Sequence, residues 1–149
     1  MFEKILMPSD GSSFALHAAR YGADLAKKYG SQVTLLYVAE VPPTIGMTES
    51  EAGCEQARQD LAAYGKDALT KTRAIFEEAG VHPEEELVVG SAVPTILRHA
   101  RDGGYDLLVI GSRGAGTTAI DQILIGSVAE GILHGAPCPV LMIRPPQTA

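Results

Sequence analysis

Short apolar runs rich in Val, Ile and Leu alternate with longer segments of helical periodicity along the chain. Near-continuous hydrophobicity of this kind is typical of strands that are covered on both faces, as in a parallel sheet. The pattern therefore predicts an α/β architecture with five strands: Lys4–Met7, Gln32–Val38, Glu86–Val89, Leu107–Ile110 and Val140–Ile143.

Glycines mark the ends of the first two predicted helices. Apolar residues recur at helical spacing over residues 15–29 and 57–79, and each series stops at a glycine, Gly30 or Gly80. A glycine just past the last turn is the expected left-handed cap.

Serines open the other two predicted helices. Ser91 is placed to cap a helix that runs to about Arg101, and Ser127 with Glu130 forms a capping-box pattern for a helix that ends near Gly135. Strands and helices then alternate strictly. Right-handed crossovers therefore predict an open, doubly wound parallel sheet with strand order 3-2-1-4-5.

Composition excludes several classes of protein. The length suits one domain over residues 1–149, and 46% apolar residues argue against disorder. A net charge of −6 and only 5% aromatic residues argue against nucleic-acid binding, which needs a basic patch or a stacking platform. No apolar run is long enough to cross a bilayer, and residues 1–8 carry no signal-peptide pattern. Cys54 and Cys138 form no paired framework, so we expect free thiols in the cytoplasm.

The predicted topology indicates where a ligand would bind. In an open α/β sheet, ligands bind at the carboxyl ends of the strands where the strand order reverses, here between the first and fourth strands. The first strand leads into Pro8–Ser12 and the fourth into Gly111–Gly116, while Gly126 and Ser127 open the next helix. We expect these segments to meet at one crevice.

The residues at this crevice suit a phosphorylated ligand. Glycines allow close backbone approach, and a helix start offers unpaired amides and a positive dipole end. A guanidinium adds positive charge, and a carboxylate, unsuited to phosphate, is an acceptor for a ribose hydroxyl. The glycines are Gly111, Gly114, Gly116 and Gly126, the helix start adds the Ser127 hydroxyl, the cation is Arg113 and the carboxylate is Asp10.

Each of these residues also has a plain structural interpretation, and both interpretations stay open. Asp10 can simply shape a turn before a helix cap at Ser12 or Ser13. Ser127 can cap its own helix without any ligand, and Arg113 can be a solvated surface charge.

One connection is longer than the usual link between a strand and a helix. The segment from Ala39 to Ala52 contains Pro42, Pro43 and Gly46. It is either a surface loop or a flap or partner-contacting arm beside the strand ends.

Four sequence segments together resemble the universal stress protein family, and the resemblance spans the whole chain. They are Lys-Ile-Leu-Met-Pro-Ser-Asp-Gly-Ser at residues 4–12, Val-Val-Gly-Ser-Ala at 88–92, Leu-Leu-Val-Ile-Gly-Ser-Arg-Gly at 107–114 and Ala-Pro-Cys-Pro-Val-Leu-Met-Ile-Arg at 136–144. The resemblance implies a Rossmann-like fold akin to the adenine nucleotide alpha hydrolases. It also implies a homodimer formed through the last strand, Val140–Ile143.

The same resemblance implies an adenine nucleotide ligand: ATP first, with ADP or AMP as alternatives and Mg²⁺ attending the phosphates. Its nucleotide-binding branch carries the pattern G-x2-G-x9-G-[S/T]. Carried over, the resemblance places Asp10 at the ribose and Pro8 with Val38 around the adenine. The phosphate loop matches at Gly111, Gly114, Gly126 and Ser127.

The chain departs from this pattern in the length of one loop. Eleven residues separate Gly114 from Gly126 where the pattern has nine. Counting from Gly116 restores nine but makes the first pair G-x-G, so two extra residues lie around residues 115–119. Asp121 in this loop is either a repellent for phosphate or a metal-facing carboxylate.

Three functions stay open. The first is an ATP-binding stress or regulatory module, and the second is a nucleotide-free dimeric interaction protein, which the longer loop favours. The third is slow ATP hydrolysis, with Asp10 or Asp121 positioning a metal ion or water. No nucleophile–base set, Walker loop or zinc-ligand spacing is present, so no catalytic or metal-ligating residue is predicted. The histidines are expected to be structural or solvated, and Cys138 to be buried rather than reactive.

Overall fold

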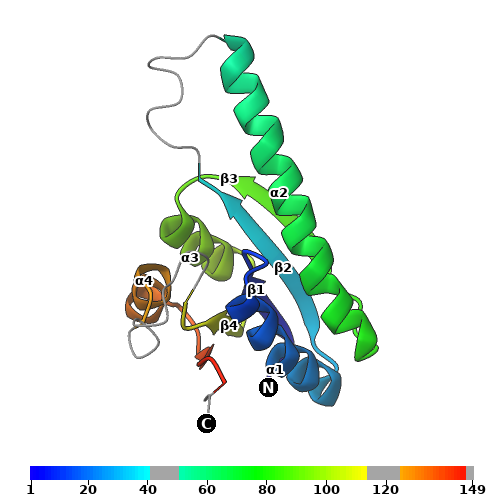
Figure 1. Cartoon of the computed structure of the whole chain (residues 1–149). Helices are drawn as coiled ribbons and strands as arrows, with labels where there is room; N and C mark the ends of the chain where they lie inside the picture. The colour runs from blue at the N-terminus through cyan, green and yellow to red at the C-terminus, as the bar shows by residue number, and fades with distance from the viewer. Residues whose placement is uncertain (41–50, 114–124, 147–149) are drawn as a thin grey trace.

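The predicted order of strands and helices is confirmed in a computed structural model, which describes residues 1–40, 51–113 and 125–146 (Figure 1). Within these residues, five parallel strands form one sheet in the order β3-β2-β1-β4-β5. The strands are β1 (Lys4–Pro8), β2 (Gln32–Ala39), β3 (Glu84–Val89), β4 (Leu107–Gly111) and β5 (Val140–Ile143). The helices are α1 (Ser13–Tyr29), α2 (Glu51–Glu78), α3 (Ala92–Asp102) and α4 (Ser127–Gly135).

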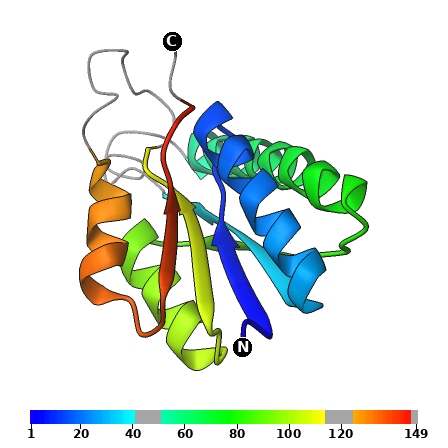
Figure 2. The same ribbon diagram turned by 90° about the horizontal axis from the view of Figure 1, so that it is seen from below.

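Two helices cover each face of the sheet (Figure 2). α1 and α2 pack over a buried cluster that contains Ile5, Leu35 and Phe76. α3 and α4 pack over a second cluster that contains Leu6 and Leu36. Successive residues of β1 and β2 thus enter opposite clusters, and burial on both faces explains the unbroken hydrophobicity of these strands.

The glycine caps are confirmed. Gly30 ends α1 in the left-handed conformation at φ 64°. Gly80, two residues beyond α2, has φ 84°. Of the two serines considered for the start of α1, it is Ser12 whose hydroxyl accepts the Ala15 amide at 3.2 Å.

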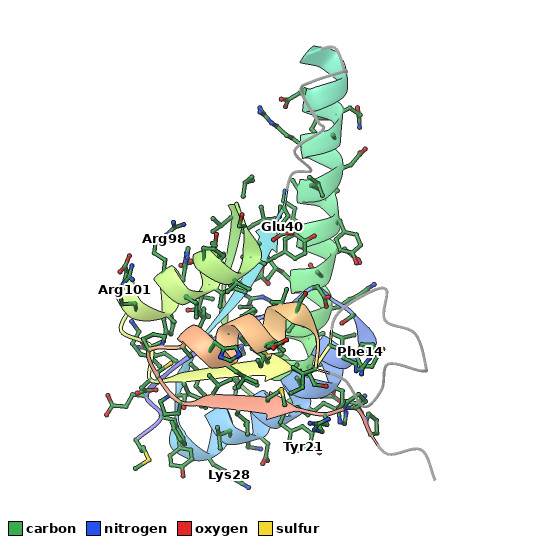
Figure 3. The ribbon with its side chains drawn as sticks, turned by 90° about the vertical axis from the view of Figure 1, so that its left-hand side faces the viewer. Phe14, Tyr21, Lys28, Glu40, Arg98 and Arg101 are labelled. Carbon is green, nitrogen blue, oxygen red and sulfur yellow. The ribbon has the colours of Figure 1, made fainter. Side chains whose placement is uncertain are left out.

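One predicted serine cap is confirmed in position only, and the other is wrong. Ser91 occupies the cap position of α3 but makes no side-chain cap hydrogen bond, and the Glu40 carboxylate accepts the Ala92 amide instead, at 2.6 Å (Figure 3). The residue that caps α4 is Gly126, so Ser127 is its first helical residue and forms no capping box with Glu130. The backbone of Gly126 is already fixed, because its amide donates to the Ser112 carbonyl at 2.7 Å.

The long connection is shorter at both ends than the sequence indicates. Ala39 still belongs to β2, and α2 already begins at Glu51. Residues 41–50 lie outside the described part of the chain. The first turns of α2 extend past the end of the sheet (Figure 1).

The edge strand β3 begins two residues earlier than predicted. Its first three residues, Glu84, Glu85 and Glu86, are all exposed. Side chains of neighbouring helices pair with two of these carboxylates, Arg73 with Glu85 and His99 with Glu86 at 3.1 Å.

Glycines on α4 set its distance from α3. A Cβ atom at Gly131 would lie 2.9 Å from Cγ2 and 3.0 Å from Cγ1 of Val93. Valine has a stiff, branched side chain that cannot turn away, so the two helices approach this closely only because residue 131 has no side chain.

Gly131→Val is therefore expected to destabilise the protein by about 1–3 kcal/mol through overpacking. Helix propensity alone would favour valine over glycine, so a loss reports the clash. His134→Val is the matched control on the same helix, because His134 is 80% exposed. Urea denaturation measures both, and equal midpoints for the two variants would contradict the close contact.

Candidate functional site

A cavity of about 390 Å³ opens at the carboxyl ends of β1, β2 and β4. This is the predicted switch point, because α1 leaves β1 toward one face of the sheet and α4 leaves β4 toward the other. The volume is in the range of small-molecule sites. The wall is mainly apolar and includes Leu36, Ala92, Ile96, Ile110 and Ile132.

Seven of the nine predicted site residues line this one cavity. They are Pro8, Asp10, Val38, Gly111, Arg113, Gly126 and Ser127. The other two, Gly114 and Gly116, lie outside the described residues, as does Asp121.

Arg113 is buried, which rules out the solvated surface charge considered from the sequence. The residue is only 5% exposed although its side chain lines the cavity. Its Nε and Nη2 atoms have no hydrogen-bond acceptor among the described residues. Buried guanidinium nitrogens without acceptors are costly, so Arg113 is a strong candidate for contact with an anion.

The start of α4 lies in the same cavity wall. No side chain caps this helix, so no described side chain accepts from the amides of its first turn. These amides and the positive end of the helix dipole favour an anionic group. A Cβ at Gly126 would lie 3.3 Å from the Ser112 carbonyl oxygen and 3.5 Å from Arg113 Cα, so the chain segments meet closely here.

Asp10 lies in the turn between β1 and α1. Its Oδ1 atom accepts the Ser12 amide at 2.9 Å, so the turn interpretation is confirmed. A carboxylate has further acceptor capacity, and Asp10 also lines the cavity, so the turn does not exclude a ligand contact.

Tyr37 lies close to Asp10 and was not singled out from the sequence. Burial raises the pKa of its hydroxyl, and the charges of Tyr64 and Asp10 raise it further. The hydroxyl therefore stays protonated at neutral pH beside the Asp10 turn. A tyrosine in an apolar strand carries no sequence signal of such a position.

The apolar wall was also not predicted. Ile96 and Ile132 are buried helix residues of the second core cluster. In the sequence they follow the ordinary helical spacing of core residues, so nothing separates a cavity wall from a packed core.

The histidines and Cys138, for which the sequence predicts no catalytic or metal-binding role, lie in ordinary local environments. His17 packs edge-on against Tyr21, and His134 lies 3.8 Å from Glu130. Burial is the main cause that raises the pKa of the Cys138 thiol, which disfavours the reactive thiolate.

Neither a metal cluster nor a membrane helix is found in residues 1–40, 51–113 and 125–146. No three His, Cys, Asp or Glu side chains in this part of the chain gather as metal ligands. None of its helices is long and apolar enough to cross a bilayer.

Comparison with known proteins agrees with the fold and the site. The model of the universal stress protein family matches residues 1–144. Universal stress protein MJ0531 of Methanocaldococcus jannaschii is 35% identical over 147 residues, which cover 99% of this chain and 85% of that protein. The solved structure of MJ0577, from the same organism, superposes with a TM-score of 0.83 at 26% identity over 99% of both chains.

More distant solved structures share the fold, and three of them hold nucleotides. An Archaeoglobus fulgidus universal stress protein in complex with dAMP has a TM-score of 0.67 at 20% identity, over 97% of this chain and 98% of that one. A universal stress protein in complex with cAMP has a TM-score of 0.66 at 21% identity, over 95% and 97%. An Arabidopsis thaliana member with AMP bound has a TM-score of 0.66 at 18% identity, over 95% and 90%. On the family match across residues 1–144, the chain belongs to the universal stress protein family.

Proposed function

We propose that this chain binds an adenine nucleotide, foremost ATP, in the cavity at the β1–β4 switch point. The observation that carries the proposal is the buried Arg113, whose Nε and Nη2 atoms have no acceptor among the described residues. A phosphate group would supply those acceptors and would also face the uncapped start of α4. The family members solved with cAMP, dAMP and AMP support an adenine nucleotide in this fold.

The remaining cavity residues would contact different parts of the nucleotide. Asp10 accepts from a ribose hydroxyl, and Pro8 with Val38 gives the adenine an apolar wall. Mg²⁺ binds through phosphates, waters and few carboxylates, so it would accompany the phosphates rather than need a protein cage.

The bound nucleotide acts as a regulatory signal in the cytoplasm, carried by a homodimer. β5 lies at the open edge of the sheet and consists of the uncharged residues Val140–Ile143. An uncharged edge strand with unpaired backbone groups supports pairing with a second copy.

Calorimetric titration of nucleotide-stripped protein with ATP and Mg²⁺ tests the proposal. We expect saturable micromolar binding near one site per chain. Absence of heat, together with an unchanged melting temperature at millimolar ATP, would overturn it.

Asp10→Asn is expected to weaken ATP binding by about 10- to 100-fold, as for loss of a hydrogen bond to a charged group. Asparagine keeps the oxygen that accepts the Ser12 amide but presents an NH₂ group where the ribose hydroxyl needs an acceptor. Asp24→Asn is the matched control, because Asp24 is 67% exposed and pairs only with Lys28 among the ion pairs of the described residues. Equal affinity in both variants would remove Asp10 from the site.

The second candidate is a nucleotide-free dimeric interaction protein. It is favoured by the eleven residues between Gly114 and Gly126, two more than the family pattern. It predicts a dimer whose melting temperature does not respond to ATP, so the same titration separates the two functions. Retention of Gly126 and Ser127 at the cavity favours the first.

A further inference from the structure

The turn that carries Asp10 is fastened to helix α2 by a buried chain of hydrogen bonds. Ser9 Oγ lies 2.7 Å from Thr72 Oγ1, and both residues are buried, at 6% and 0% exposure. The Thr72 hydroxyl donates to the Ala68 carbonyl at 2.7 Å, so its single proton is already used. Ser9 is therefore the donor to Thr72, and Ser9 Oγ in turn accepts the Gly11 amide at 3.2 Å.

A second contact fastens the other side of the same turn. Gly11 has φ +74°, and a Cβ atom there would lie 2.9 Å from Cα of Ala68. The backbone of the turn thus rests directly on the backbone of α2. Asp10 therefore lies between two residues, Ser9 and Gly11, that each contact α2.

The fastening is specific to one face of α2. Thr70 makes the same type of bond to its own helix, donating to the Lys66 carbonyl at 2.8 Å, but it lies on the exposed face. Of these two threonines, it is Thr72 that links its helical bond to the Asp10 turn. The two threonines are therefore a matched pair for mutation: Thr72 is hydrogen-bonded to the Asp10 turn through Ser9, and Thr70 is bonded to its own helix.

We propose that Thr72 is a positioning residue, which holds the Asp10 carboxylate where it selects nucleotides that carry ribose hydroxyls. The inference rests on the proposed nucleotide function and deepens it by naming what sets the sugar preference. Thr72 is not among the residues that line the cavity. Its effect passes through Ser9 to the turn, so it must appear in the preference between sugars and not only in stability.

The test compares ATP with 2′,3′-dideoxy-ATP, which lacks both ribose hydroxyls. In the unmodified protein we expect ATP to bind about 10-fold more tightly or better, since a carboxylate contact is lost with the dideoxy compound. Thr72→Val keeps the side-chain shape but removes the acceptor for Ser9. We expect it to weaken ATP about 10-fold, leave dideoxy-ATP nearly unchanged and bring the ratio of the two affinities close to one.

Three further variants make the result specific. Thr72→Ser keeps the hydroxyl and should retain the preference for ATP over dideoxy-ATP. Ser9→Ala removes the same hydrogen bond from the other side and should bring the ratio of the two affinities close to one. Thr70→Val should leave both affinities and their ratio unchanged. Should Thr72→Val prove too unstable to study, Ser9→Ala carries the test.

The possible failures can be told apart. If the unmodified protein binds neither compound, the proposed function falls and this inference with it. If it binds ATP, but Thr72→Val weakens both nucleotides by the same factor or neither, Thr72 is merely structural and only this inference is overturned.

Discussion

Replacing Arg113 with methionine is expected to weaken ATP binding by about 10- to 100-fold while the nucleotide-free protein becomes no less stable. The two effects have one cause. Arg113 is 5% exposed, and its Nε and Nη2 atoms find no acceptor among the described residues. Its burial costs free energy in the free protein, and a bound phosphate recovers that cost.

The sign of the stability change separates a ligand-binding arginine from a structural one. A buried charge that is paired within the fold destabilises the protein when one partner is removed. A buried charge reserved for a ligand does the opposite, and methionine fills a similar volume without the desolvation cost. We expect the free energy of unfolding of Arg113→Met to rise by about 1 kcal/mol or more. The ATP-induced rise in melting temperature should largely disappear.

Two controls accompany this measurement. Arg101→Met removes an arginine that is 68% exposed and pairs with Asp102, so it should change neither ATP affinity nor stability appreciably. Arg113→Lys keeps the charge but loses the planar fork of donors, so its ATP affinity should be intermediate. A loss of stability with unchanged ATP affinity in Arg113→Met would show that the guanidinium serves the fold alone.

Gly11→Ala is expected to be the most destabilising single methyl addition in the site, at about 2–4 kcal/mol. Part of the loss comes from the left-handed backbone at φ +74°, and part from contact with α2. The new Cβ would lie 2.9 Å from Cα and Cβ of Ala68, which is 2% exposed and belongs to the core. Backbone atoms in a packed helix cannot move aside as a flexible side chain can.

Gly30→Ala reports the first part of this loss, the backbone strain, by itself. Gly30 has φ +64°, but a Cβ atom added there would have no described neighbour within 4 Å, so alanine meets only the backbone strain of about 1–2 kcal/mol. Urea denaturation of both variants gives the cost of the contact by difference. Equal losses would show that the Asp10 turn is free to lift from α2, and ATP affinity should then survive Gly11→Ala.

The fold was largely predictable because its signals are local and repeated. β1, β2 and β4 lie in the interior of the sheet and are buried on both faces, so each of them is an apolar run in the sequence. The early start of β3 was not predictable, since Glu84 and Glu85 disfavour strands. They pair with Thr34 and Leu35 of β2, and Arg73 also contacts Glu85.

The polar residues of the site were predictable to the extent that they follow strand ends. Asp10 and Arg113 each lie two residues after the end of β1 and β4, where topology alone indicates a ligand. Thr72 was not predictable, because a threonine within a helix shows no sign of a partner 63 residues away. The capping box at Ser127 was wrong for a similar reason: a tertiary bond from Gly126 to Ser112 sets where α4 begins.

The glutamates at the start of β3 also limit how many copies can assemble through the sheet. Glu84, Glu85 and Glu86 are exposed on this edge, with Glu85 paired to Arg73 and Glu86 to His99. Charged side chains on an edge strand deter the addition of another strand there. In the proposed homodimer, the pairing edge is β5 at the opposite side of the sheet. A two-fold pairing through β5 consumes the open edge of both copies, so assembly closes at two and cannot propagate into a filament.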